Sequence, residues 1–244
     1  MLSGGPKRIL FACILATGFL FNIQTSSAMT VLAADLPDLI RDSHTIVRAQ
    51  VTTVQNLVLD TEGNSVDERT LATLDKNTSP KGLRAFTDVT IRILEHYKGE
   101  GNEGGTLSFR LVGGTMGPFT LAIPGMPKFQ PNTEVVLFLE KTGTSLIPLG
   151  ASQGVFRIDR TNQGSMVAVH DLKGMAIVRH DVVPEGCNEH TADEQRCAPR
   201  TGPGVPAIPE RMPFSVLDGQ IRAFLGLPER EGLRTAPPRV LQVR

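Results

Sequence analysis

The chain has 244 residues, and its 25 Lys and Arg balance 25 Asp and Glu, so the formal net charge is zero. This balance argues against a nucleic-acid-binding protein and against a protein bound to anionic membranes, because both need a concentrated basic surface. Trp is absent and Tyr occurs once, at Tyr97, which argues against platforms of stacked aromatic rings for bases or sugars. The core must therefore be built from Phe, Val, Leu and Ile.

Residues 1–28 have the pattern of a secretory signal peptide. Lys7 and Arg8 form a basic start, and residues 9–21 form an apolar run that is shorter than the about 20 residues needed to span a membrane. Because the leader carries two basic residues and no acidic one, the remaining chain has 23 basic and 25 acidic residues. We therefore expect a nearly neutral protein that is secreted or periplasmic and has no transmembrane segment after cleavage.

The small side chains of Ser26 and Ala28 predict cleavage after Ala28, so that the mature chain begins at Met29. Lipid attachment at Cys13 is the alternative. It is disfavoured because only residues 9–12 form an apolar stretch before that cysteine, which makes a poor export signal.

Two cysteines, Cys187 and Cys197, remain after the leader is removed. An oxidising compartment favours a disulfide between them. Zinc is the alternative, since His190 lies between the two cysteines, but the close ligand pairs typical of zinc sites are missing and a fourth ligand would have to come from elsewhere. We expect a disulfide, no metal and no cofactor.

The hydrophobic pattern changes from helical to alternating near the start of the mature chain. Leu32, Leu36, Leu39 and Ile40 recur at helical spacing and predict a short amphipathic helix. Alternation from His44 then predicts a strand that continues towards Leu59. Residues 60–84 are mostly polar and predict a long loop, with a helical turn around Leu71 and Leu74.

Strand patterns dominate the middle of the chain. Residues 86–97 alternate until Leu94 shifts the phase, which indicates a β-bulge. Residues 106–112 alternate without a break, and the continuous apolar run at residues 134–139 is typical of a strand buried on both faces. Shorter strands with glycines at their margins are expected at residues 146–149, 155–158, 166–169 and 176–178.

These elements predict a mainly β fold, an antiparallel OB-like barrel or sandwich with a short N-terminal helix and a C-terminal amphipathic helix. The barrel domain is expected over residues 29–183. The segments that follow are expected to be a Pro/Gly-rich loop with the disulfide, a helix and a flexible tail, at residues 184–213, 214–226 and 227–244.

No catalytic motif stands out. The five histidines, His44, His96, His170, His180 and His190, form no recognised cluster, and Gly-x-Ser-x-Gly does not occur. The glycine-rich stretch at residues 113–117 precedes a loop rather than a helix, so it predicts a turn and not a phosphate site.

Several segments together resemble an uncharacterised group of secreted bacterial proteins and, more remotely, the netrin module of tissue inhibitors of metalloproteinases. The matching segments are residues 42–51, 95–99, 113–114, 127–129, 134–139 and 150–157. The netrin resemblance implies an OB-type β-barrel. In those inhibitors an N-terminal Cys holds the zinc of the protease, whereas this mature chain begins at Met29, so the inhibitory mechanism does not carry over.

The sequence therefore favours an exported, non-catalytic protein that binds a protein partner or a cell-envelope component. Residues 60–84 and 113–131 are the expected contact loops, since loops on a rigid barrel usually carry recognition. Shortening residues 60–84 is expected to leave stability nearly unchanged, because a polar loop buries little apolar area. The alternatives are an inhibitor of a secreted protease and an envelope enzyme without a recognisable motif.

Overall fold

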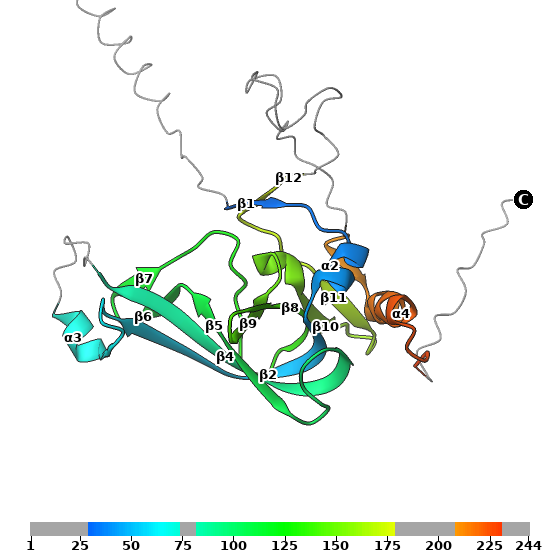
Figure 1. Cartoon of the computed structure of the whole chain (residues 1–244), viewed down its shortest axis with the longest axis horizontal. Coiled ribbons are helices and arrows are strands. Elements are labelled where there is room, and N and C mark those ends of the chain that lie inside the picture. The colour runs from blue at the N-terminus through cyan, green and yellow to red at the C-terminus, as the bar shows by residue number, and fades with distance from the viewer. Residues whose placement is uncertain (1–28, 74–81, 179–207, 231–244) are drawn as a thin grey trace, which may run out of the picture.

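The computed structural model describes residues 29–73, 82–178 and 208–230. The predicted fold class is confirmed. The protein is mainly β with largely antiparallel pairing. Two helices pack against the sheet, α2 (Leu36–Asp42) from the start of the described chain and α4 (Phe214–Leu225) from its end (Figure 1). The strands are β1 (Met29–Leu32), β2 (Thr45–Leu59), β3 (Ser65–Val66), β4 (Arg84–Lys98), β5 (Thr106–Val112), β6 (Gly114–Met116), β7 (Phe119–Leu121), β8 (Glu134–Thr142), β9 (Ser145–Pro148), β10 (Val155–Arg160), β11 (Met166–Val169), β12 (Met175–Val178) and β13 (Arg211–Pro213).

One large sheet forms the body of the molecule. Its strands follow the order β13-β11-β10-β8-β2-β4-β5, with β3 paired to β2 and β9 paired to β8. β5 also lies alongside β9, which curls the sheet towards a barrel. Two small pairs lie outside this sheet. β6 and β7 form a hairpin, and β1 pairs with β12 in parallel, an exception to the antiparallel arrangement.

The apolar alternation places two separate cores on the two faces of this sheet. Val89 and Ile91 of β4 lie opposite Phe109 and Leu107 of β5, so the two predicted alternations form neighbouring rows. Together with residues of β2, β8 and β9 they line the concave inner face of the sheet, the barrel core. The other face is covered by α2 and α4 around Phe138, and β8 contributes buried residues to both faces as predicted.

The predicted bulge at Leu94 is also confirmed. In the β2–β4 ladder, Arg48 lies opposite Glu95 and Ala49 lies opposite Ile93, so Leu94 has no partner. The extra residue changes the phase of the strand. Ile93 points into the barrel core, whereas Glu95 points to the face that α4 covers.

The first helix is shorter than its spacing predicts. Asp35 caps it by accepting a hydrogen bond from the Asp38 backbone N–H at 2.8 Å, and a proline follows Leu36 inside the first turn. These signals start the helix at Leu36. Leu32 therefore lies on β1, where it is 61% exposed, and the prediction that it belongs to the helix was wrong.

Residues 60–84 are more structured than the sequence indicates. The expected helical turn is confirmed as α3 (Glu68–Ala72), capped by Asp67, and β3 pairs with the end of β2. Leu71 is fully buried against Val58 and Ala85 in a third apolar cluster. The expectation that this segment buries little apolar area is therefore wrong, because Leu71 packs where α3 closes one end of the long β2–β4 ribbon (Figure 1).

The ends of the expected C-terminal segments also need correction. Ile208 is buried and β13 pairs with β11, so the last residues of the loop predicted at 184–213 belong to the sheet. α4 docks as predicted, except that Phe224 is 50% exposed. Arg230, assigned to a flexible tail, contacts buried carboxylates. The leader, Cys187 and Cys197 lie outside the described residues.

No helix within the described ranges is long and apolar enough to span a membrane.

Candidate binding site

The segment at residues 122–131, here called the crossing loop, follows β7 and returns over the body of the sheet (Figure 1). It contains Pro124, Pro127 and Pro131. Proline fixes φ and cannot donate a backbone hydrogen bond, so this segment does not continue a ladder and has few alternative conformations. The sequence therefore produces a stiff, irregular connection rather than a strand.

The crossing loop is anchored near its middle. The carbonyl of Gly125 accepts hydrogen bonds from the hydroxyl of Ser152 at 2.8 Å and from its backbone N–H at 3.2 Å. Gly125 has a φ of +78°, and an added Cβ would lie 2.8 Å from Met175 and 3.3 Å from Met29. The β1–β12 pair thus packs directly on the crossing loop at Gly125, because a residue without a Cβ leaves space there for Met29 and Met175.

A second anchor lies at the end of the crossing loop. The ring of Phe129 packs edge-on against Phe109 of β5, with 5.5 Å between the ring centroids. The carbonyl of Gln130 accepts a hydrogen bond from the Thr133 hydroxyl at 2.6 Å. Between the two anchors, the side chains from Met126 to Lys128 reach the surface without being held in the core.

A pocket of about 410 Å³, the Asn56 pocket, opens on one side of the crossing loop. Its wall on the sheet comes from β2, β4 and β5, with polar groups at Asn56 and Thr87 and apolar groups at Val54 and Leu111. The glycine pair after β5 shapes this wall, because an added Cβ at Gly114 would lie within 3.0 Å of three oxygen atoms of β2 and β4.

A second pocket of about 380 Å³, the Arg157 pocket, opens on the other side. Val135 of β8 and Val169 of β11 lie on either side of Arg157 of β10 and form the base of the pocket, above which the half-exposed side chain of Arg157 extends. Lys128 of the crossing loop and Lys173 of the turn before β12 line its rim. Residues 126–130 line both pockets, so the crossing loop forms a ridge between two hollows.

A third pocket, of about 650 Å³, lies at the ends of β8 and β10. Its lining is strongly charged, but the charges are largely paired. Arg157 makes two hydrogen bonds to Asp159, at 2.8 and 3.0 Å, and Arg160 lies 3.5 Å from Glu134. Such a surface is typical of solvated ion pairs rather than of a selective site.

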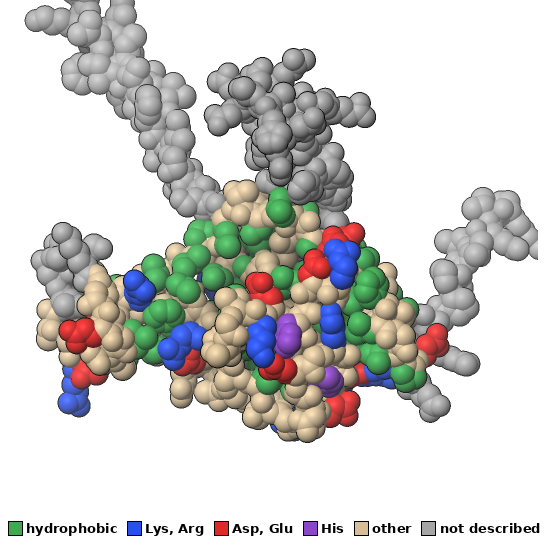
Figure 2. Space-filling model, in the orientation of Figure 1, with side chains coloured by type: hydrophobic (Ala, Val, Ile, Leu, Met, Phe, Trp, Pro, Cys, Tyr) green, Lys and Arg blue, Asp and Glu red, His purple; other side chains and the backbone are tan. Residues whose placement is uncertain are grey.

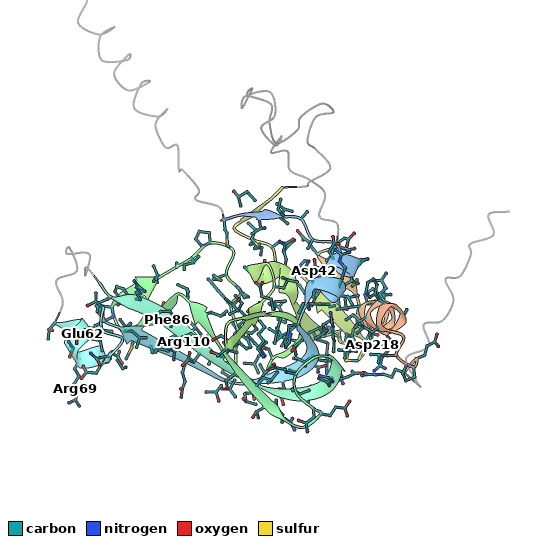
Figure 3. The ribbon with its side chains drawn as sticks, viewed as in Figure 1. Asp42, Glu62, Arg69, Phe86, Arg110 and Asp218 are labelled. Atoms are coloured by element: carbon teal, nitrogen blue, oxygen red, sulfur yellow. The ribbon has the colours of Figure 1, made fainter. Side chains whose placement is uncertain are left out.

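A buried charge cluster, which the sequence analysis missed, lies under α4. Glu95 and Asp218 are 4% and 2% exposed. Arg48 approaches Glu95 at 3.1 Å, and Arg222 lies 3.1 Å from Asp218 and also contacts Glu95. Arg230 contacts Glu95 as well, and Figure 3 shows Asp218 on the side of α4 that faces the sheet.

Tyr97 completes this charge cluster and links β4 to α4. Its hydroxyl donates a hydrogen bond to Asp218 Oδ1 at 2.6 Å. Burial raises the pKa of Asp218, and burial together with Asp218 raises the pKa of the Tyr97 hydroxyl. The two carboxylates are enclosed by arginines, and neither lines one of the three pockets described above. We therefore assign the cluster to holding α4 on the sheet.

His170 is the one buried histidine in the described ranges, at 3% exposed. Its ring stacks on Phe156 with 4.3 Å between centroids, and Nε2 bonds the Gln153 carbonyl at 2.9 Å. A carbonyl only accepts, so Nε2 carries the proton, and Nδ1 is left without a partner among the described residues. Burial lowers the pKa of His170 to about 4, so the ring is neutral at ordinary pH.

The other candidate residues are dispersed. His44 lies 3.2 Å from Glu100 and His96 bonds the Gly99 carbonyl at 2.9 Å, both near the surface at one end of β4. His180 and His190 lie outside the described residues, as do Cys187 and Cys197. Within the described ranges no group of three His, Cys, Asp or Glu could hold a metal ion.

Of the two expected contact loops, only residues 113–131 line the pockets described here, whereas residues 60–73 line none of them. On the face shown in Figure 2, hydrophobic side chains are interspersed with charges of both signs. Comparison with protein-family models, with curated proteins and with solved structures finds no match for the chain, so the resemblance to the netrin module stays a prediction.

Proposed function

We propose that the protein is an exported binding protein that holds a protein partner against the crossing loop. The observation that carries this proposal is the ridge at residues 126–130 with a pocket of about 400 Å³ on each side. A ridge between two hollows suits a partner surface that places one side chain in each hollow. Export is proposed from the leader pattern at residues 1–28.

The composition of the ridge supports a protein partner. Met126 and Phe129 belong to the residue types that are enriched at the centres of protein interfaces. The loop is already held by Ser152 and Phe109, so a partner would not have to order it on binding. The inhibitor alternative is a narrower form of this proposal, since an anchored, proline-rich loop also suits the rigid ridge that a protease inhibitor presents.

A capture experiment tests the proposal. The mature protein, residues 29–244, is immobilised and exposed to the extracellular or periplasmic fraction of the source cells. Two variants are compared with it, Met126→Ala/Lys128→Glu on the crossing loop and Arg69→Glu on α3, where Figure 3 places Arg69 at the surface. Equal melting temperatures establish that the variants are folded.

We expect one protein to be retained by the unmodified chain and by Arg69→Glu, and to be lost with the crossing-loop variant. A retained protease that loses activity on binding would support the inhibitor alternative. Retention that is the same for all three chains, or no retention by any of them, would contradict the proposed function.

A further inference from the structure

We infer that the Arg157 pocket binds the C-terminal residue of a protein partner. The apolar side chain of that residue contacts the valines at the base of the pocket, and its carboxylate contacts the basic side chains at the rim. The inference rests on the proposed function, because it names the part of the partner that enters one of the two pockets. It is argued from the apolar base, the distribution of charge and the hydrogen-bonding groups that remain available.

The base of the Arg157 pocket is apolar. Val135 is 3% exposed and belongs to the barrel core, and Val155 and Val169 are half-buried beside it. These valines lie on the inner face of the sheet at the edge of the barrel core, with Phe129 of the crossing loop at one wall. An apolar side chain entering here removes partly exposed valine surface from water, which is favourable.

The rim of the same pocket is basic. Lys128, Arg157 and Lys173 line it together with one carboxylate, Asp171, and Asp159 partly neutralises Arg157 from outside the pocket. Neither lysine forms an ion pair with another residue of the described part. The remaining positive charge favours a ligand that carries a single negative charge.

Arg157 is oriented to donate. Its Nε and Nη2 atoms donate to the two oxygens of Asp159, at 2.8 and 3.0 Å, which fixes the plane of the guanidinium. Within the described residues Nη1 makes no hydrogen bond, so its N–H groups are available to a carboxylate.

The arrangement distinguishes a C-terminal residue from an acidic side chain. In Asp or Glu the charge is at the tip, so a side chain inserted into the pocket would bring a carboxylate onto the apolar base and lose its hydration. In a C-terminal Leu or Val, the apolar side chain and the carboxylate leave the same carbon atom. The base and the rim can then be reached at once, as in other sites that capture a terminal carboxylate.

Three probes test this inference on the ¹⁵N-labelled mature protein. The first is acetyl-glycyl-glycyl-leucine with a free carboxylate, the second is the same peptide with a C-terminal amide, and the third is octanoate. Binding is measured from backbone amide shifts in NMR titrations. We expect the acid to bind at least about tenfold more tightly than the amide, with the largest shifts at Val155, Val169 and Lys128, and with weaker binding at high salt.

Matched variants locate the charge. Lys128→Ala/Lys173→Ala should weaken binding of the acid about threefold to tenfold, as expected for two partly exposed charges. Arg69→Ala, which removes a surface cation of α3 outside the pocket, should leave the affinity unchanged. Equal affinity for the acid and the amide, or shifts away from the Arg157 pocket, would overturn the inference. Tighter binding of octanoate than of the peptide acid would also overturn it, and would assign the site to a free acyl carboxylate.

The two proposals fail in different ways. If the peptide acid does not bind but capture of a partner still depends on the crossing loop, the inference falls and the proposed function stands. If the peptide acid binds but capture is independent of the crossing loop, the proposed function falls and the Arg157 pocket remains a carboxylate site.

Discussion

Arg48 of β2 and Glu95 of β4 lie 3.1 Å apart on the face that α4 covers, and the bulge at Leu94 brings them together. Ile91 and Ile93 point into the barrel core on the other face. If β4 paired regularly through Leu94, with no bulge, Glu95 would share the face of Ile91 and Ile93 and carry an unpaired carboxylate into that apolar core. The bulge at Leu94 therefore decides whether this carboxylate is isolated or surrounded by arginines.

Replacing Glu95 by Gln should destabilise the protein by about 3 kcal/mol or more. The change keeps the shape of the side chain but removes the charge that Arg48, Arg222 and Arg230 share, and breaking a buried ion pair in this way typically costs about 3 to 5 kcal/mol. The free energy of unfolding in urea measures the effect.

Asp88→Asn is the matched control for this prediction. Asp88 lies on the same strand and bonds Arg110 at 2.6 Å, but its side chain is 37% exposed and that of Arg110 is 48% exposed. Figure 3 shows Arg110 beside Phe86, and the guanidinium lies over the phenyl ring. This change should cost less than about 1 kcal/mol. Equal costs for the two substitutions would mean that burial does not set the strength of the Glu95 contacts.

Two glycines with nearly the same positive φ allow the cost of backbone strain to be separated from the cost of a steric clash. Gly99 and Gly104 have φ values of +80° and +79°. An added Cβ at Gly104 meets nothing within 4 Å, whereas at Gly99 it would lie 2.0 Å from the carbonyl oxygen of His44. Gly104→Ala should therefore cost about 1 to 2 kcal/mol from the backbone alone.

Gly99→Ala carries the same backbone cost and must also move β4 away from the chain at His44. We expect its free energy of unfolding to fall by at least about 2 kcal/mol more than that of Gly104→Ala. Similar free energies of unfolding for the two variants, measured in the same denaturant titration, would show that the chain at His44 moves away from the added Cβ at little cost.

The strands could be predicted from the sequence because their signals are local. The unbroken alternation of Leu107, Phe109 and Leu111 and the phase shift at Leu94 each follow from the two-residue period of a strand. The spacing of Leu32 predicts too long a first helix, because the capping side chain of Asp35 sets the start of the helix at Leu36.

The candidate site could be predicted only in part. The loop at residues 113–131 was expected, but the Asn56 pocket depends on β2 and β4 and the Arg157 pocket on β10 and β11, which meet the loop only in the folded chain. The charge cluster was missed because Glu95 and Arg222 are 127 positions apart, and no local pattern links them. The phase shift at Leu94 was the one signal of the cluster in the sequence, because it places Glu95 on the face of β4 that Ile91 and Ile93 do not share.

Phe109→Ala should destabilise the protein by about 3 to 5 kcal/mol. Phe109 is 5% exposed, packs in the barrel core and supports Phe129 at the end of the crossing loop, so its removal leaves a cavity that the long β-ladder closes poorly. Val112→Ala on the same strand is the control, because Val112 is 44% exposed and should cost less than about 0.5 kcal/mol. A Phe109→Ala cost below about 1 kcal/mol would contradict the burial of this ring.

His170 should make the protein less stable as the pH falls from about 6.5 to about 4. Burial lowers its pKa from 6.5 to about 4 in the folded protein. In this pH range the unfolded chain therefore binds a proton at His170 and the folded chain does not. The stabilisation is complete above pH 6.5 and falls by about 3 kcal/mol by pH 4. Glu100 and Asp159, whose pKa values are lowered by hydrogen bonds to Lys141 and Arg157, lose their contributions only below about pH 4.5. Urea titrations of the unmodified chain and of His170→Gln between pH 7 and 4.5 measure this effect, and we expect the fall in stability on acidification to disappear in the variant. Asp218, whose pKa burial raises, contributes in the opposite direction. An unchanged slope in His170→Gln would assign the pH dependence to another group.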